Sequence, residues 1–311
     1  MRISCSGIRL AGIIKLLPFQ GDRLAHIIPR AMPWARGFCP YRACGAYMRN
    51  LNKETEEFMG NFRFKQFEIE QDRCAMKVGT DGVLLGAWAQ GGRRILDIGS
   101  GTGLISLMMA QRFPEAEVVG IDMDADACGQ AKENVMASPF RGRVEIECCR
   151  LQDFGADGCA LETAGLKTGA LETAADLKSS GVFDAIVSNP PFFVDSLKNP
   201  DSKRTMARHT DSLPFRDLFA GVKRLLSDDG VFSAIVPAEV VELFVAESCM
   251  LGFYLIRKCG VKTVERKQPK RFMLSFAKHR ISPYEEHVET MMDSQGNRSE
   301  WYRKITEEFY L

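Results

Sequence analysis

Two short motifs in the sequence have residue types and a spacing suited to chemistry. One is the glycine-rich run LDIGSGTG at residues 96–103, and the other is SNPPF at residues 188–192. Each follows a short run of apolar, strand-forming residues, so each is expected where a buried strand ends. Ligands of open α/β sheets bind at the carboxyl ends of the strands, which makes both motifs candidates for one site.

The glycine-rich run indicates a loop that a ligand can approach closely, since glycine permits tight turns. Its G-x-G-x-G spacing departs from the dinucleotide fingerprint G-x-G-x-x-G. Asp97, two residues before Gly99, would repel a pyrophosphate but suits a cofactor that carries an ammonium group and a sulfonium. Asp122 ends the next predicted strand, where a carboxylate can accept hydrogen bonds from both ribose hydroxyls. The alternative is a plain turn with an incidental glycine run.

The Asn-Pro-Pro-Phe motif suits chemistry on a planar nitrogen. The lone pair of an exocyclic amine on a base or amide is delocalised, so that nitrogen is a poor nucleophile. The Asn189 side-chain oxygen and the Pro190 carbonyl can each accept one of its N–H bonds, which turns the lone pair towards an electrophile without a strong base. Phe192 offers an aromatic face for stacking on the target ring. Asn-Pro alone is a common turn, and its pairing with the glycine run makes it specific.

The surrounding sequence alternates between strand and helix patterns from residue 92. The predicted helices span residues 104–112, 125–137, 213–226 and 238–251, and the predicted strands 94–98, 117–122, 144–148, 182–187, 230–236, 254–258 and 271–276. This order predicts an α/β fold with a mostly parallel, doubly wound sheet of seven strands and helices on both faces.

Two segments fall outside this pattern. Residues 1–60 are rich in Arg, Gly, Pro and Cys and lack periodicity, which predicts a poorly ordered N-terminal extension. A targeting or RNA-binding arm is the alternative. Residues 160–169 and 170–179 are near copies of each other, which predicts a surface insertion at 155–180 within a single domain of residues 61–311.

Composition excludes several classes of protein. The formal net charge of +1 means that nucleic acid would have to be bound by a local patch. The ten cysteines include no Cys-x-x-Cys pair, so no metal site is expected, and dispersed thiols favour a reducing, cytoplasmic location. No apolar run reaches the length of a membrane span. Two basic groups could contact phosphates or be solvated loops: Lys198, Lys203, Arg204, Arg208 and His209, and Lys262, Arg266, Lys267, Lys270 and Arg271.

With these motifs in place, the sequence resembles the Rossmann-like methyltransferases that use S-adenosylmethionine (SAM) and carry an N-P-P-[YF] motif. Within them it is similar to the bacterial tRNA1(Val) (adenine(37)-N6)-methyltransferase family. The similarity is carried by FKQF at residues 64–67, DRCAMKVGTDG at 72–82 and LLGAW at 84–88, and by the carboxyl-terminal EFYL at 308–311.

The resemblance implies roles for further residues. Asp97, Gly99 and Gly101 would line the amino-acid part of SAM, with Lys77, Thr80 and Asp81 nearby. Asp122 would hold the ribose, and Asn189, Pro190 and Phe192 would hold the target adenine of a tRNA. Relatives often carry an acidic residue for the SAM adenine just after the third strand. Here Arg150 stands at that place, so Asp153 is the candidate.

Three other functions compete with tRNA adenine-N6 methylation. Phe192 also permits guanine-N2 methylation of ribosomal RNA, because enzymes of that kind also carry Phe at this place, whereas relatives that act on adenine often end the motif in Tyr. Glutamine-N5 methylation of a peptide release factor poses the same chemical problem, but residues 1–60 do not resemble the helical domain of those enzymes. A non-catalytic RNA-binding module would not need Asp97, Asp122 and Asn189. A monomer is favoured for the enzyme.

Overall fold

The computed structural model describes residues 61–74, 77–155, 183–191 and 213–311. These residues belong to one compact unit, Phe58–Leu311. The predicted extension 1–60, nearly all of the predicted insertion 155–180, the basic residues 198–209 and Phe192 lie outside the described residues, and the predictions made for them stay predictions.

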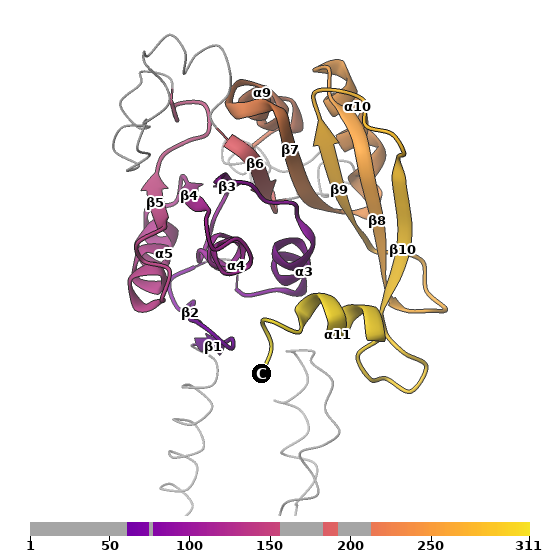
Figure 1. The fold of residues 1–311 in the computed structure, drawn as a ribbon, viewed down its shortest axis with the longest axis horizontal. Helices are drawn as coiled ribbons and strands as arrows, with labels where there is room; N and C mark the ends of the chain where they lie inside the picture. Colours follow the sequence, from indigo (N-terminus) through magenta and orange to yellow (C-terminus); the bar gives the residue numbers. More distant parts are fainter. Residues whose placement is uncertain (1–60, 75–76, 156–182, 192–212) are drawn as a thin grey trace, which may run out of the picture. The chain divides into compact units, whose positions relative to one another are not determined.

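The described strands form one large sheet in the order β10-β8-β9-β7-β6-β3-β4-β5 (Figure 1). In chain order they are β3 Arg94–Ile98, β4 Glu117–Asp122, β5 Val144–Cys148, β6 Phe183–Ser188, β7 Leu226–Pro237, β8 Tyr254–Val264, β9 Arg271–Ala277 and β10 Glu285–Met292. β9 pairs antiparallel with β7 and β8, and the other pairings in the sheet are parallel. The predicted Rossmann-like, mostly parallel fold is confirmed.

The prediction of seven strands needs one correction, because β10 makes eight. Apolar and polar residues alternate only weakly in its sequence, EEHVETMM, and the first four residues are exposed. β10 pairs only with β8 among the described strands and lies at the sheet edge. An edge strand that buries little apolar surface leaves a weak hydrophobic signal in the sequence.

Helices cover both faces of the sheet, as predicted. Successive strand residues point to opposite faces. Ile95 belongs to the core cluster that includes residues of α3 Thr80–Trp88, α4 Leu104–Arg112 and α5 Ala125–Ala137. Figure 1 shows these three helices in a row. Leu96 joins the other core cluster, with α9 Phe215–Leu225 and α10 Val241–Met250, which the short helix η4 Ala238–Val240 precedes.

The amino-terminal elements of the domain pack onto the α3 face of the sheet. β1 Asn61–Arg63 and β2 Glu68–Glu70 form a short antiparallel hairpin. The carboxyl-terminal helix α11 Glu300–Thr306 packs against α3, and the Lys65 N–H donates to the Phe309 carbonyl at 2.8 Å. Both ends of the region that resembles the methyltransferase family are therefore joined beside α3. In the described part of the chain, no helix is long and apolar enough to cross a membrane.

Candidate active site

The sheet topology brings both chemical motifs to one edge. In the parallel register Ile98 of β3 lies opposite Ile121 of β4 on one side and Ser188 of β6 on the other. Gly99 and Asn189 therefore leave adjacent strands side by side. The Ser188 hydroxyl fixes this arrangement by donating to the Ile98 carbonyl at 2.8 Å. The chain runs from β3 outward to β4 and β5 on one side and to β6 and β7 on the other, so this is the topological switch point where such sheets bind ligands.

The glycine loop between β3 and α4 requires its glycines. Gly99, Gly101 and Gly103 have φ angles of 74°, 52° and 80°, a region that side chains rarely adopt. A Cβ placed on Gly99 or Gly101 would meet no atom within 4 Å, so these two positions face open space. The loop therefore presents bare backbone to a ligand, next to the amino end of α4.

A cavity of about 370 Å³ opens in front of this loop. That volume lies within the range of sites for small molecules and cofactors. Six of the predicted site residues line it: Lys77, Thr80, Asp81, Gly99, Gly101 and Asn189. The lining also contains residues that were not predicted for the cofactor: Val78, Gly79, Gly82, Ser100, Thr102, Leu104, Ile105 and Arg271.

Asn189 reaches the cavity from a rigid support. It is half-buried, Pro190 is buried, and Pro191 is exposed. Each proline fixes its own φ angle, and Pro190 and Pro191 restrict the residues before them. Asn189 thus stands beside the glycine loop at the cavity, whereas Pro190 does not line it, and the acceptance of a planar amine by the Asn189 oxygen and the Pro190 carbonyl stays a prediction.

Asp97, Asp122, Asp153 and Pro190 are predicted site residues that do not line the cavity, and Asp97 is the one whose side chain is withdrawn into the core. It is fully buried, and the Ser106 hydroxyl donates to its Oδ2 at 2.7 Å. Oδ1 has no hydrogen-bond partner among the described residues. Burial raises the pKa of Asp97 to about 7, although the Ser106 hydrogen bonds oppose the shift. Its contact with a cofactor stays a prediction.

This raised pKa predicts a pH dependence of stability. A carboxyl whose pKa is higher in the folded than in the unfolded state stabilises the fold while it is protonated. Its contribution is complete below pH 4, roughly the unfolded-state pKa, and is lost as the pH rises through about 7. Asp97→Asn should remove this pH-dependent contribution to the free energy of unfolding. Urea unfolding of the ligand-free proteins from pH 4 to 8 should show wild type losing stability relative to Asp97→Asn. A constant difference would show that Asp97 does not titrate in this range.

Asp122 supports the glycine loop from the end of β4. Its Oδ2 accepts the Gly101 N–H at 2.9 Å, and its Oδ1 accepts the Asp124 N–H at 3.0 Å. A carboxylate has about four lone-pair positions, so acceptor capacity remains for ribose hydroxyls. Asp122 is half-buried. It does not line the cavity itself, but its hydrogen-bond partner Gly101 does. Asp153 is exposed in the turn after β5 and does not line the cavity. Its contact with the adenine of a cofactor stays a prediction.

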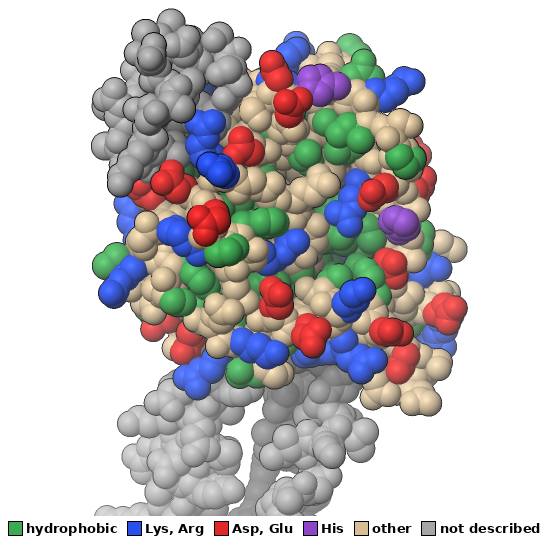
Figure 2. Space-filling view, viewed as in Figure 1, with side chains coloured by type: hydrophobic (Ala, Val, Ile, Leu, Met, Phe, Trp, Pro, Cys, Tyr) green, Lys and Arg blue, Asp and Glu red, His purple; other side chains and the backbone are tan. Residues whose placement is uncertain are grey.

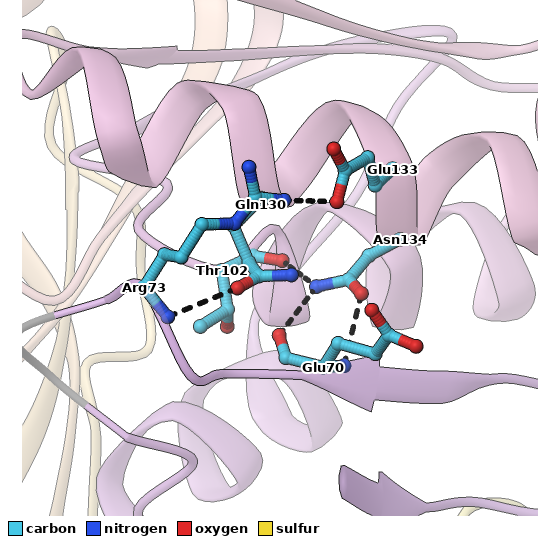
Figure 3. A network of polar contacts seen from close by, with 6 residues as sticks. All are labelled: Glu70, Arg73, Thr102, Gln130, Glu133 and Asn134. Atoms are coloured by element: carbon cyan, nitrogen blue, oxygen red, sulfur yellow. Dashed lines mark hydrogen bonds and ion pairs between the residues drawn. The ribbon is translucent and has the colours of Figure 1, made fainter. Parts of the chain in front are cut away.

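Asn134 was missed by sequence reasoning and joins the hairpin to the glycine loop (Figure 3). Its side-chain amide donates to the carbonyls of Glu70 and Thr102, both at 2.9 Å, and accepts the Glu70 N–H at 2.9 Å. One turn earlier on α5, Gln130 accepts the Arg73 N–H at 3.1 Å. Two polar residues four positions apart on the buried face of a helix are a signal that could have identified this network.

Replacing Asn134 with Ala should lower the free energy of unfolding by about 1–3 kcal/mol, because buried backbone groups lose their partners. Urea denaturation measures this effect. Glu133→Gln on the same helix is the control: Glu133 is exposed and pairs with Arg73, so its loss should cost less than about 1 kcal/mol. Equal effects of the two variants would contradict a structural role for the Asn134 network.

Three comparisons with known proteins bear on this site. A family model described as a methyltransferase domain matches residues 95–164. A tRNA1(Val) (adenine(37)-N6)-methyltransferase of Bacteroides thetaiotaomicron is 43% identical over 80% of this chain and 97% of its own length. The Phocaeicola vulgatus protein of the same name is 46% identical over the same shares.

The chain belongs to the tRNA1(Val) (adenine(37)-N6)-methyltransferase family. The predicted resemblance to this family is thereby confirmed. A crystal structure of a predicted O-methyltransferase from Agrobacterium tumefaciens superposes with a TM-score of 0.52 at 17% identity, covering 74% of this chain and 96% of that one. This likeness supports the fold. Among the described residues, no cluster of three or more His, Cys, Asp and Glu could hold a metal ion.

Proposed function

We propose that this chain transfers the methyl group of SAM to the N6 amino group of adenine 37 in tRNA1(Val), the reaction named for its relatives. The observation that carries the proposal is the shared cavity. Asn189, which suits a planar amine, lines the same space as the glycine loop and the segment Lys77–Gly82. Donor and acceptor of a methyl group can therefore meet inside one pocket.

The cavity suits SAM in its open space and in its charge. Gly99 and Gly101 leave open the space that side chains would fill, and the lining carries both signs of charge, on Lys77, Asp81 and Arg271. The methionine part of SAM is itself zwitterionic. Lys77, Thr80 and Asp81 would hold that part, the glycine loop would face it, and Asp122 would accept the ribose hydroxyls. When bound, SAM supplies an electrophilic methyl group on its sulfonium.

The residues of the β6 end then act on the amine. The Asn189 oxygen and the Pro190 carbonyl each accept a hydrogen bond from one N–H of the adenine amino group. These two hydrogen bonds orient the nitrogen lone pair towards the cavity. The nitrogen becomes acidic once it carries the methyl group, so its proton can leave to water without a strong base. Phe192 would stack on the adenine ring, worth about 1–3 kcal/mol for a stacked base.

Family membership favours this reaction over the alternatives left open by the sequence. Guanine-N2 and glutamine-N5 methylation use the same motif but are not the activities named for the relatives described above. A non-catalytic RNA-binding module would not need to bind SAM, and a calorimetric titration with SAM separates that case.

We further propose that the partner is tRNA, that the enzyme works in the cytoplasm where tRNA is modified, and that it acts as a monomer. On the face in Figure 2, basic and acidic side chains are interspersed, in keeping with the net charge of +1. tRNA binding would therefore depend on local groups such as Lys262, Arg266, Lys267 and Lys270.

The test is tritiated methyl transfer from SAM to unmodified tRNA1(Val), followed by nucleoside analysis. We expect label in N6-methyladenosine, and a transcript with guanine in place of adenine 37 should take up none. Label in methylguanosine or in protein would refute the substrate assignment and leave the amine-orienting role of Asn189 standing.

A further inference from the structure

Arg271 lines the cavity, although the sequence predicted a contact with tRNA for it. It stands last in the basic group Lys262, Arg266, Lys267, Lys270 and Arg271, which was predicted to contact tRNA phosphates. In the structure Arg271 lines the cavity, and the other members of that group do not. Lys270, its immediate neighbour, is exposed.

The antiparallel direction of β9 brings Arg271 to the site. Arg271 is the first residue of β9 and lies opposite Pro237, the last residue of β7, and Val261 of β8. Because β7 runs parallel to β3 and β6, its last residue lies at the edge where the glycine loop and Asn189 begin. Only a strand that runs the other way can place its first residue there.

Arg271 makes an ion pair with Asp81 in the first turn of α3. The Arg271 side chain is 24% exposed and that of Asp81 is 42% exposed, so both are partly withdrawn from water. Burial raises the pKa of Asp81, and Arg271 opposes that shift. The third ionisable residue of the cavity lining is Lys77. The lining thus holds a cation and an anion in contact, next to the glycine loop.

We propose that Arg271 binds the carboxylate of the methionine part of SAM, while Asp81 receives its ammonium group. The inference rests on the proposed function. A zwitterionic ligand can replace the Arg271–Asp81 contact by two charge-assisted contacts of its own, so neither charge is left unpaired when the ligand binds. The planar guanidinium fork matches a carboxylate in a way that a lysine ammonium does not.

The test compares two ligands by calorimetry. SAM carries the amino-acid group, and 5′-methylthioadenosine keeps the adenosine and the methylated sulfur, as a neutral thioether, but lacks that group. Arg271→Ala should weaken SAM binding on the order of tenfold to a hundredfold, as expected when a charge-assisted hydrogen bond is lost. Binding of methylthioadenosine should change less than about threefold. Arg271→Lys should restore part of the SAM affinity. Lys270→Ala removes the same charge one residue away and should leave both affinities unchanged.

Two results would overturn the inference. If Arg271→Ala binds SAM normally but binds tRNA more weakly, Arg271 contacts tRNA and not the cofactor. An equal loss for both ligands would mean that Arg271 supports the pocket without touching the amino-acid group. If Arg271→Ala does not fold, Arg271→Gln is measured in its place with the same criteria. Failure of the wild type to bind SAM would instead refute the proposed function itself.

Discussion

Asn189→Ala should lower the turnover number by about two to three powers of ten, because positioning and electrostatic help at the reacting amine are lost. SAM affinity should stay within a few-fold of wild type, since Asn189 enters the cavity from the end of β6 and the cofactor is assigned to the glycine loop and α3. The measurement is steady-state methyl transfer to unmodified tRNA at saturating SAM, with calorimetric SAM binding alongside.

Gln152→Ala is the matched control for Asn189→Ala. It also removes a side-chain amide, but Gln152 is exposed and outside the cavity lining, so both turnover and SAM affinity should be unchanged. Normal turnover by Asn189→Ala would show that the mechanism is wrong even though the family assignment stands.

Asp122→Ala should weaken binding of both SAM and methylthioadenosine by roughly 1–3 kcal/mol, because hydrogen bonds from the ribose hydroxyls to a carboxylate are lost. Both ligands carry the ribose, so this variant differs from Arg271→Ala, which should affect SAM alone. Calorimetry of the two ligands with the two variants separates the ribose from the amino-acid contacts.

The Asp122 side chain also accepts two backbone N–H groups, so part of the effect could come from the loop. Asp122→Asn keeps one acceptor oxygen and should fall between Ala and wild type. Glu117→Ala removes an exposed carboxylate from the opposite end of the same strand and should not change either affinity. Wild-type affinity in Asp122→Ala would remove Asp122 from the cofactor site.

The central strands could be predicted from the sequence because they are short buried runs between clear breaks. Residues 94–98, 117–122 and 144–148 were predicted as strands, and β3, β4 and β5 have the same bounds. Helix α3 was not predicted. Seven of its nine residues are buried, two of them glycines, so it has no single apolar stripe. Gly86 lies so close to α4 that a Cβ there would come within 2.7 Å of the Met108 sulfur.

The site residues also divide into those with a local sequence pattern and those placed by tertiary packing. Residues inside one contiguous motif could be assigned because the motif itself carries the chemistry, and Gly99, Gly101 and Asn189 do share a cavity. Arg271 could not be assigned to the cavity, because its place depends on the direction of β9 and on a partner 190 positions earlier in the chain. That pairing arises from tertiary packing and leaves little local pattern. Asn134 did leave a signal, four positions after Gln130 on the buried face of α5, but its partners depend on which element meets that face.

The most direct test of the account is mass mapping of tRNA1(Val) from cells with and without the gene, complemented by wild type or by Asn189→Ala. Loss of the gene should remove one methyl group from adenine 37. Wild type should restore it, and Asn189→Ala, expressed at the same level, should restore little of it. If adenine 37 still carries its methyl group after loss of the gene, the proposed function is contradicted. Full restoration of the methyl group by Asn189→Ala would contradict the role given to Asn189.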